Sequence, residues 1–304
     1  MSKRRNRKRY KLAHPFVLFY LTVFLAVIFV SVYYVLPRSL EKQNAYRMVQ
    51  KFADLPITAQ AVYVYDDTDH KLIWAHNAYK SLPLASITKL MTTLCTVEHM
   101  STESVVAVDQ NILLATTTVQ TPEPQEEVKL HDLIAFTLVR SSNEGAESMA
   151  EYVGGNKSML DCMNTRAREL GMNHTFYGNT TGLDVDVGKA GDFGSARDVY
   201  KLFSYMLPRY YDILKLTALD RFSLTADSGT MYTAYNTNIA LQNIPHIVAS
   251  KTGYTDTAGG NLAFAMEPSP GRLIYVVILG STWDGRFDDA KKLAELINEL
   301  YDNN

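Results

Sequence analysis

The chain has 304 residues, 47% of them hydrophobic and 20% charged, and a formal net charge of −2. This composition is typical of a globular protein with a sizeable apolar core, and it excludes a disordered or low-complexity chain. The charge is uneven, because residues 1–11 carry seven basic side chains and no acidic one, which leaves 23 Lys and Arg against 32 Asp and Glu elsewhere. A basic tail can bind nucleic acid, but the next segment favours a membrane, and we expect no nucleic-acid partner.

Residues 16–36 follow the tail as a run of 21 residues without charge, FVLFYLTVFLAVIFVSVYYVL. About 20 apolar residues in a helix span a bilayer, and the preceding basic residues place the N-terminus in the cytoplasm. A cleaved signal peptide would have a shorter apolar stretch and a small-x-small cleavage site, which SVYYVLPRSL lacks. We therefore expect a basic cytoplasmic tail over residues 1–15, an uncleaved single-pass transmembrane anchor over 16–36, a linker over 37–58 and an extracytoplasmic domain over 59–304.

The body of the chain begins with a predicted β-hairpin and continues with predicted helices. Residues 60–65 and 71–76 are rich in β-branched and aromatic residues and flank an acidic turn, which indicates two paired strands. Apolar residues at three- and four-residue spacing predict the helices that follow. Their expected bounds are 86–100, 131–139, 144–153 and 157–170, and then a helix that begins with the capping-box sequence SARD at 195–198 and ends before Pro208.

Strand patterns return at the C-terminal end of the body. Residues 247–250, 261–266 and 273–279 read as strands with a turn at 268–271, and residues 287–301 form an amphipathic closing helix. Because strands lie at both ends and helices fill the middle, the sequence predicts an α+β fold with an antiparallel sheet from the N- and C-terminal segments and an inserted all-helical lobe. An active site commonly lies in the cleft between two such lobes.

Cys95 and Cys162 are the only cysteines in the chain. They could form one disulfide in an oxidising compartment, but we favour the interpretation that both are small buried residues. The seven histidines show no HExxH or other ligand spacing. The sequence therefore predicts no metal site, and we expect no cofactor.

Three short motifs occur in order along the body. They are S-x-x-K at residues 86–89, S-x-N at residues 141–143 and K-T-G at residues 251–253. A single match is a weak signal, since residues 39–42 also fit S-x-x-K. The three together gain weight from their predicted contexts, because the first opens a helix, the second lies between two helices and the third follows a strand.

The spacing of the first motif suits a serine nucleophile with a lysine base. Residues i and i+3 of a helix share a face, so Ser86 and Lys89 can come within hydrogen-bond reach. A serine hydroxyl is a weak nucleophile until a neighbouring base takes its proton. Lysine can be that base if burial and a second cation lower its pKa, and Lys251 is a plausible second cation. The backbone N–H groups of Ser86 and Tyr254 are candidates for an oxyanion hole.

The other motif residues suit the binding of a peptide that ends in a carboxylate. Ser141 would relay a proton to the leaving amine, and Asn143 would hold Lys89 and the substrate amide. Lys251 and Thr252 would bind the carboxylate, and glycine at the third position lets a substrate backbone lie close to the strand. The predicted site therefore has three catalytic and five substrate-binding residues: Ser86, Lys89 and Ser141, and then Asn143, Lys251, Thr252, Gly253 and Tyr254.

From about residue 59 to 300 the sequence resembles the low-molecular-mass penicillin-binding proteins, the D-alanyl-D-alanine carboxypeptidases related to serine β-lactamases. The stretches that carry the resemblance are LPLASITKLMT, NTTGLD, GSARD and ASKTGYTDTAGGNLAF. The resemblance implies that Ser86 is the acyl-enzyme nucleophile, Lys89 the proton acceptor, Ser141 the active-site serine and Lys251 a substrate-binding lysine. It further implies a peptidoglycan stem peptide as substrate and β-lactam antibiotics as covalent inhibitors.

Some features depart from the family pattern and leave alternatives open. Family members usually carry Asp after S-x-N, where this chain has Glu144. A D,D-endopeptidase would use the same residues. A class A β-lactamase would need a glutamate in an E-x-x-L-N sequence to activate water, and ELGMN at residues 169–173 fits it only loosely. A penicillin sensor would have further membrane spans and a signalling region, which we do not find in this sequence.

Overall fold

The computed structural model describes residues 15–114 and 125–302, so that most of the basic tail lies outside the described residues. The chain divides into two compact units, residues 1–53 and 54–304. Within the described residues, no helix combines the length and the apolarity needed to cross a membrane, so the predicted anchor is not confirmed. The first unit contains two α-helices and a π-helical turn between them: α1 (Pro15–Val30), the turn Ser31–Val35 and α2 (Leu36–Ala53).

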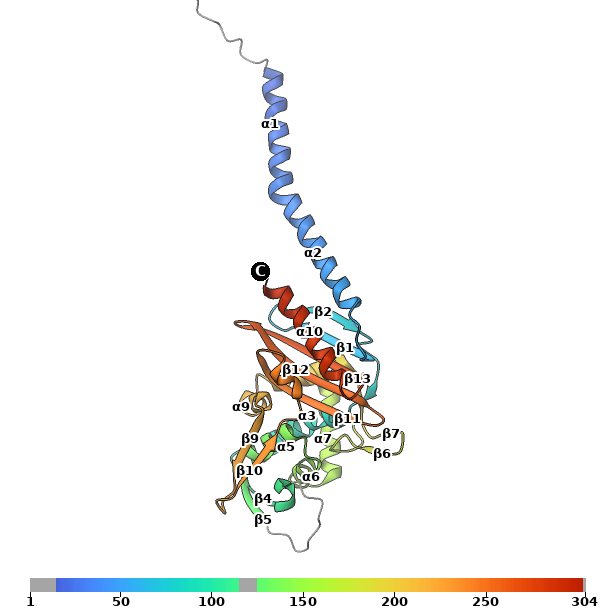
Figure 1. Cartoon of the computed structure of the whole chain (residues 1–304), viewed down its shortest axis with the longest axis vertical. Coiled ribbons are helices and arrows are strands. Elements are labelled where there is room, and N and C mark those ends of the chain that lie inside the picture. Colours follow the sequence, from blue (N-terminus) through green and yellow to red (C-terminus); the bar gives the residue numbers. More distant parts are fainter. Residues whose placement is uncertain (1–14, 115–124, 303–304) are drawn as a thin grey trace, which may run out of the picture. The chain divides into compact units, whose positions relative to one another are not determined.

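The second unit is built on a five-stranded antiparallel sheet with the strand order β11-β12-β13-β1-β2 (Figure 1). The N-terminal hairpin joins the C-terminal strands where β1 pairs with β13, which confirms the predicted sheet from both ends of the body. The strands are β1 (Ala61–Asp66), β2 (Lys71–His76), β11 (Ile247–Thr255), β12 (Gly259–Ser269) and β13 (Arg272–Ser281).

Helices are the main regular elements of the chain between β2 and β11, and a long helix follows the last strand. The larger helices agree with the predicted bounds to within a few residues. They are α3 (Lys89–His99), α5 (Leu130–Arg140), α6 (Asn143–Tyr152), α7 (Asn156–Glu169), α8 (Ala196–Met206) and α10 (Gly285–Asp302). Shorter turns of helix connect them: η2 (Ala85–Thr88), α4 (Gln110–Leu114), α9 (Tyr211–Leu214), η3 (Lys215–Ala218) and η4 (Ile239–Gln242).

The inserted lobe is not all helical, which corrects the prediction. It also contains two-stranded antiparallel ladders, each made of strands of two to five residues. Strands this short hold too few alternations for a period of two to stand out in the sequence. The ladders pair β3 (Leu82–Pro83) with β8 (Phe193–Gly194), β4 (Val105–Asp109) with β5 (Gln125–Lys129), β6 (Asp184–Asp186) with β7 (Lys189–Ala190), and β9 (Arg221–Thr225) with β10 (Met231–Tyr235).

The five-stranded sheet is covered on both faces. Successive side chains of a strand point to opposite faces, and on one face Tyr63 packs against Tyr200 of α8, with ring centroids 5.2 Å apart. Val62, its neighbour in β1, is fully buried on the other face. Leu293 and Ile297 of α10 are also fully buried but lie outside the core cluster that contains Tyr63. The sheet is therefore enclosed between the inserted lobe and the closing helix.

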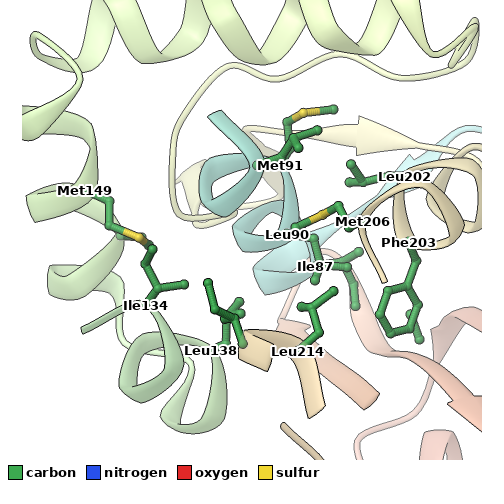
Figure 2. Close-up of a cluster of buried hydrophobic side chains, with 14 of the residues drawn as sticks. Ile87, Leu90, Met91, Ile134, Leu138, Met149, Leu202, Phe203, Met206 and Leu214 are labelled. Carbon is green, nitrogen blue, oxygen red and sulfur yellow. The ribbon is translucent and has the colours of Figure 1, made fainter. Parts of the chain in front are cut away.

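Helix α3 lies at the centre of the inserted lobe. Leu90 and Met91 of α3 and Ile87 of the preceding turn η2 are at most 1% exposed, and their spacing of three and four residues places them on the same buried side. Figure 2 shows them among side chains from four other helices, which are Ile134, Leu138, Met149, Leu202, Phe203, Met206 and Leu214. Each such burial contributes about 1.5–3 kcal/mol, so the helix that begins with Lys89 is held firmly in place.

Cys95 and Cys162 form a disulfide, so the favoured interpretation of two unpaired buried cysteines was wrong. Cys95 lies on α3 and Cys162 on α7, with their Cα atoms 6.1 Å apart, which suits a disulfide. Their sequence separation of 67 hid this proximity in the sequence. The bond links the helix that begins with Lys89 to a neighbouring helix and restricts the unfolded chain.

Candidate active site

The first motif forms a tight turn that leads into α3. Ser86 lies in the 3-10 turn η2, and Lys89 is the first residue of the α-helix. The turn is entered through Ala85, which has a positive φ of 47°, an uncommon conformation for a residue other than glycine. The Lys89 Nζ lies 2.8 Å from the Ser86 Oγ. The expected i, i+3 contact is therefore present, although the serine belongs to a 3-10 turn rather than to the α-helix.

Lys89 is fully buried and has three polar neighbours at its Nζ. Besides Ser86, they are the Asn143 Oδ1 and the Thr181 backbone carbonyl, both at 2.7 Å. Burial lowers the pKa of Lys89 to about 7, although Glu144 and other nearby carboxylates oppose the shift. A neutral amine has two N–H groups and one lone pair. Because the amide oxygen and the carbonyl can only accept, they take both N–H groups, and the lone pair is directed at the Ser86 hydroxyl.

The second and third motifs meet in a separate hydrogen-bonded group. Ser141 caps the C-terminus of α5 with a left-handed backbone, φ 65°, and its Oγ accepts a hydrogen bond from the Lys251 Nζ at 2.8 Å. The same Nζ donates to the Thr252 carbonyl at 2.8 Å. Burial lowers the pKa of Lys251 well below its ordinary value, and the charges of Lys89 and Arg286 lower it further. The Thr252 hydroxyl is 2.5 Å from the hydroxyl of Thr237.

The K-T-G sequence lies inside strand β11 rather than after it, which corrects the predicted strand end at residue 250. This placement brings the strand against the nucleophile turn. A Cβ atom added to Gly253 would lie 2.9 Å from the Leu84 carbonyl oxygen and 3.1 Å from the Ser86 nitrogen. Only glycine leaves room there, so its role includes close packing of β11 on the turn that holds the serine.

Tyr254 follows the third motif, but its side chain points elsewhere. The residue is 38% exposed, and its ring makes an edge contact with Trp283, with centroids 4.5 Å apart. Its hydroxyl donates to the Asp256 Oδ1 at 3.3 Å rather than to a motif residue. The backbone of Tyr254 remains next to Gly253. The oxyanion role predicted for this residue concerns only its N–H group and stays a prediction.

Arg286 is a member of this site that sequence reasoning missed. Its side chain is 3% exposed, and its Nη1 donates to the Gly253 carbonyl at 2.7 Å. Burial lowers its pKa to about 10, and the guanidinium lies 4.5 Å from the Trp283 ring centroid. In the sequence it is one arginine at the start of an amphipathic helix, with no motif around it. Only the packing of α10 on the sheet identifies it as a third buried cation.

The NTTGLD stretch supplies the backbone that contacts Lys89. The Asn179 Oδ1 accepts hydrogen bonds from the backbone N–H groups of Thr181 at 3.1 Å and Gly182 at 2.7 Å. This local turn directs the Thr181 carbonyl at the lysine. The signal available in the sequence was the Asn-Thr-Thr-Gly turn composition itself, to which no chemical role had been assigned.

The glutamate of the loose E-x-x-L-N match makes other contacts. Glu169 ends α7, and its side chain is 53% exposed and paired with Arg166. The Arg166 Nη2 in turn donates to the Tyr205 hydroxyl at 2.9 Å. These contacts engage the carboxylate with residues outside the three motifs, which argues against a water-activating role.

The sequence model of the D-alanyl-D-alanine carboxypeptidase family matches residues 48–282. The chain is similar to D-alanyl-D-alanine carboxypeptidase DacF of Bacillus subtilis, with 26% identity over 280 residues, 88% of this chain and 68% of that protein. It is also similar to the D-alanyl-D-alanine endopeptidase of Escherichia coli K12, with 28% identity over 253 residues, 78% of this chain and 76% of that protein.

A comparison with solved structures leads to the same group of proteins. Penicillin-binding protein D2 of Listeria monocytogenes, in its ampicillin-bound form, matches with a TM-score of 0.66 and 28% sequence identity. The match covers 80% of this chain and 98% of that chain. The α+β arrangement of an antiparallel sheet with an inserted, mainly helical lobe is thus a known fold.

Proposed function

The chain belongs to the D-alanyl-D-alanine carboxypeptidase family, and from this premise we propose that it removes the terminal D-alanine of peptidoglycan stem pentapeptides through an acyl-enzyme on Ser86. The observation that carries the proposal is the buried Lys89, whose Nζ lies 2.8 Å from the Ser86 Oγ and whose pKa is lowered to about 7. A base with a pKa near the working pH is the most effective proton acceptor.

In the acylation step, the Ser86 Oγ attacks the carbonyl carbon of the penultimate D-alanine, and its proton passes to Lys89. The backbone N–H groups of Ser86 and Tyr254 stabilise the oxyanion. The C–N bond to the terminal D-alanine then breaks, and Ser141 relays to the leaving amine the proton that Lys89 took up, so that Lys89 is neutral again. Water next attacks the ester carbonyl and gives up a proton to Lys89, which releases the tetrapeptide and returns a proton to the Ser86 Oγ.

The terminal carboxylate of the substrate is bound on the cationic side of the site. Lys251 of β11 donates to Ser141 at 2.8 Å and Arg286 of α10 to the Gly253 carbonyl of β11 at 2.7 Å, so that two buried basic side chains lie at this strand. Charge-assisted hydrogen bonds to a carboxylate are stronger than neutral ones. Thr252 contributes a hydroxyl, and Asn143 holds Lys89 and the substrate amide. These contacts select a peptide that ends one residue beyond the scissile bond.

The same reaction on a β-lactam ring leaves a covalent adduct on Ser86, because the ring amide takes the place of the scissile bond. The similarity to a penicillin-binding protein that has been solved with ampicillin supports this part of the proposal. Covalent labelling by a penicillin therefore reports on the same nucleophile as peptide hydrolysis.

We further propose that residues 16–36 anchor the chain in the membrane, with residues 1–15 in the cytoplasm and residues 59–304 outside. The uncharged run and its basic flank support this topology, and so does the Cys95–Cys162 disulfide, since disulfides persist in oxidising compartments. The test is protease added to intact cells that express the chain. Digestion of the body with protection of the tail is expected, and protection of both would refute the topology.

A D,D-endopeptidase is the second candidate, because the similar protein from Escherichia coli carries that name. An endopeptidase would use the same nucleophile and base on a cross-linked dimer. The two activities are separated by offering the full-length chain, in detergent, a stem pentapeptide and a cross-linked dimer side by side.

The deciding experiment measures D-alanine release from the pentapeptide by the full-length chain and by Ser86→Ala. We expect release and fluorescent-penicillin labelling from the wild type and neither from the variant. Labelling of Ser86→Ala at another serine would refute the assignment of the nucleophile. Rapid turnover of the penicillin without D-alanine release would favour a β-lactamase, and labelling without any turnover would favour a sensor.

A further inference from the structure

We propose that Asp192, a buried carboxylate outside the three motifs, is a positioning residue that holds Ser86 and Lys89 in reactive alignment with the turn that carries Thr181. The inference rests on the proposed roles of Ser86 and Lys89. It adds to them a residue that the sequence did not single out and that touches neither reacting atom.

Asp192 makes hydrogen bonds to both sides of the nucleophile turn. Its side chain is 1% exposed, and its Oδ2 accepts a hydrogen bond from the Thr88 hydroxyl at 2.7 Å. Its Oδ1 accepts from the backbone N–H groups of Gly178 at 2.7 Å and Asn179 at 2.9 Å. Its backbone carbonyl accepts from the N–H of Leu84 at 3.1 Å. One residue thus fixes the chain before Ser86, the residue before Lys89 and a separate loop.

The loop held by Asp192 is the one that contacts the lysine. Asn179, whose N–H donates to the carboxylate, also organises the turn whose Thr181 carbonyl lies 2.7 Å from the Lys89 Nζ. At Gly182 this turn approaches the nucleophile turn so closely that an added Cβ would lie 1.9 Å from the Ala85 carbonyl oxygen. A shift of this loop relative to Thr88 would therefore move the lysine and the serine apart.

The carboxylate also acts on Lys89 through its charge. It accepts three hydrogen bonds and donates none, as an ionised carboxylate does. Burial raises the pKa of Asp192, while Thr88 and the two N–H groups oppose that rise. Its negative charge raises the pKa of Lys89, against the effect of burial.

Other charged groups face the same lysine. Glu144 and Glu147 of α6 also raise the pKa of Lys89, and Lys251 of β11 faces it as a cation. Among the carboxylates, Asp192 is the one that also bonds to the turn between Ser86 and Lys89. Its removal should therefore change both the alignment and the protonation of the lysine.

Asp198 provides a matched control from the next helix. It is also 1% exposed, and its Oδ2 accepts hydrogen bonds from the His174 N–H at 2.7 Å and the Thr175 hydroxyl at 3.1 Å. It too joins two segments of the same lobe, but among the described residues none of its hydrogen-bond partners bonds to Lys89 or to the nucleophile turn. A merely structural role would make the two aspartates equivalent in their effect on the reaction.

The experiment measures the rate of Ser86 acylation by a fluorescent penicillin against pH, with the full-length chain in detergent. Acylation needs neutral Lys89, so the rate rises as pH passes the pKa of that lysine. For Asp192→Asn we expect a loss on the order of 10- to 100-fold, since small displacements of reacting groups have large effects. The rising limb of the plot of acylation rate against pH should also move to lower pH, because the variant lacks a negative charge that favours the protonated form of Lys89.

Two further variants separate alignment from charge. Thr88→Val removes the hydroxyl but keeps the Asp192 charge. We therefore expect the acylation rate to fall about tenfold, with the rising limb at the same pH as in the wild type. Asp198→Asn should lower the melting temperature without moving the limb. Thr88→Val also keeps the proposal testable if Asp192→Asn does not fold.

The proposal is overturned if Asp192→Asn folds, is acylated at the wild-type rate and shows the wild-type dependence of that rate on pH. It is also overturned if Asp198→Asn reproduces the loss and the shift, or if Thr88→Val is acylated at the wild-type rate. Failure of the proposed function looks different, because the wild type itself would then not be labelled at Ser86, and the role of Asp192 would fall with it.

Discussion

Lys89 and Lys251 are both almost fully buried, at 0% and 1% exposure, yet their surroundings are opposite in charge. Lys89 is opposed by carboxylates that raise its pKa, which burial still lowers to about 7. Lys251 has cations as neighbours, so burial and charge both lower its pKa. Two lysines of one site are thus prepared for different tasks.

The difference in charge around the two lysines divides the site into a side around Lys89 and a side around Lys251. On the Lys89 side, negative charges keep the amine close to its protonation equilibrium, which suits a group that takes up and returns a proton. On the Lys251 side, the concentration of cations disfavours each charge until an anion arrives. A substrate carboxylate would supply that anion and raise the pKa of Lys251. We propose that one side exchanges a proton and that the other binds the negative charge of the substrate.

The largest expected effect comes from removing the proton acceptor. Lys89→Ala should slow acylation by a fluorescent penicillin on the order of 10²- to 10⁴-fold, the range that general acid–base catalysis contributes. Stopped-flow labelling with the full-length chain measures this rate. Lys201→Ala is the control, since Lys201 is a partly buried lysine that bonds to the Gly171 carbonyl outside the site. Wild-type acylation by Lys89→Ala would remove the distinction between the two lysines.

A smaller loss is expected on the anion-binding side. Lys251→Ala should reduce kcat/KM for the pentapeptide on the order of 10- to 100-fold, because a hydrogen bond to a charged group contributes about 1.5–3 kcal/mol. The matched comparison is a pentapeptide whose terminal carboxylate is amidated. The wild type should prefer the free acid, and the variant should hardly distinguish the two. An undiminished preference for the free acid would place the carboxylate elsewhere.

The smallest effect concerns the carboxylates around Lys89. The pKa of Lys89 is about 7 in the folded chain, so acylation should rise with pH through that region as the protonated form disappears. Glu144→Gln removes a charge that favours the protonated form, and the rising limb should therefore move to lower pH. Acylation rates between pH 5 and 9 test this, and a limb that moves to higher pH would contradict the assignment of Lys89 as the titrating base.

Much of the architecture could be predicted from the sequence, and the failures have a common cause. Residues 71–76 were predicted as a strand with the observed bounds, and the longer helices were predicted to within a few residues, because sustained periodicity reports on burial. The short ladders in the inserted lobe were missed because two to five residues carry no such pattern. β11 was predicted to end at residue 250, whereas pairing with β12 extends the strand to Thr255.

By itself, the sequence determined the family and predicted the chemistry, through a serine and a lysine three residues apart and two further motifs in order. Only the tertiary structure decided the environment of these groups. It brought the Thr181 carbonyl to Lys89, Arg286 to β11, and Cys95 to Cys162, none of which adjoins its partner in the chain. The physical reason is that a pKa depends on burial and on nearby charges, and segments distant in the sequence supply both.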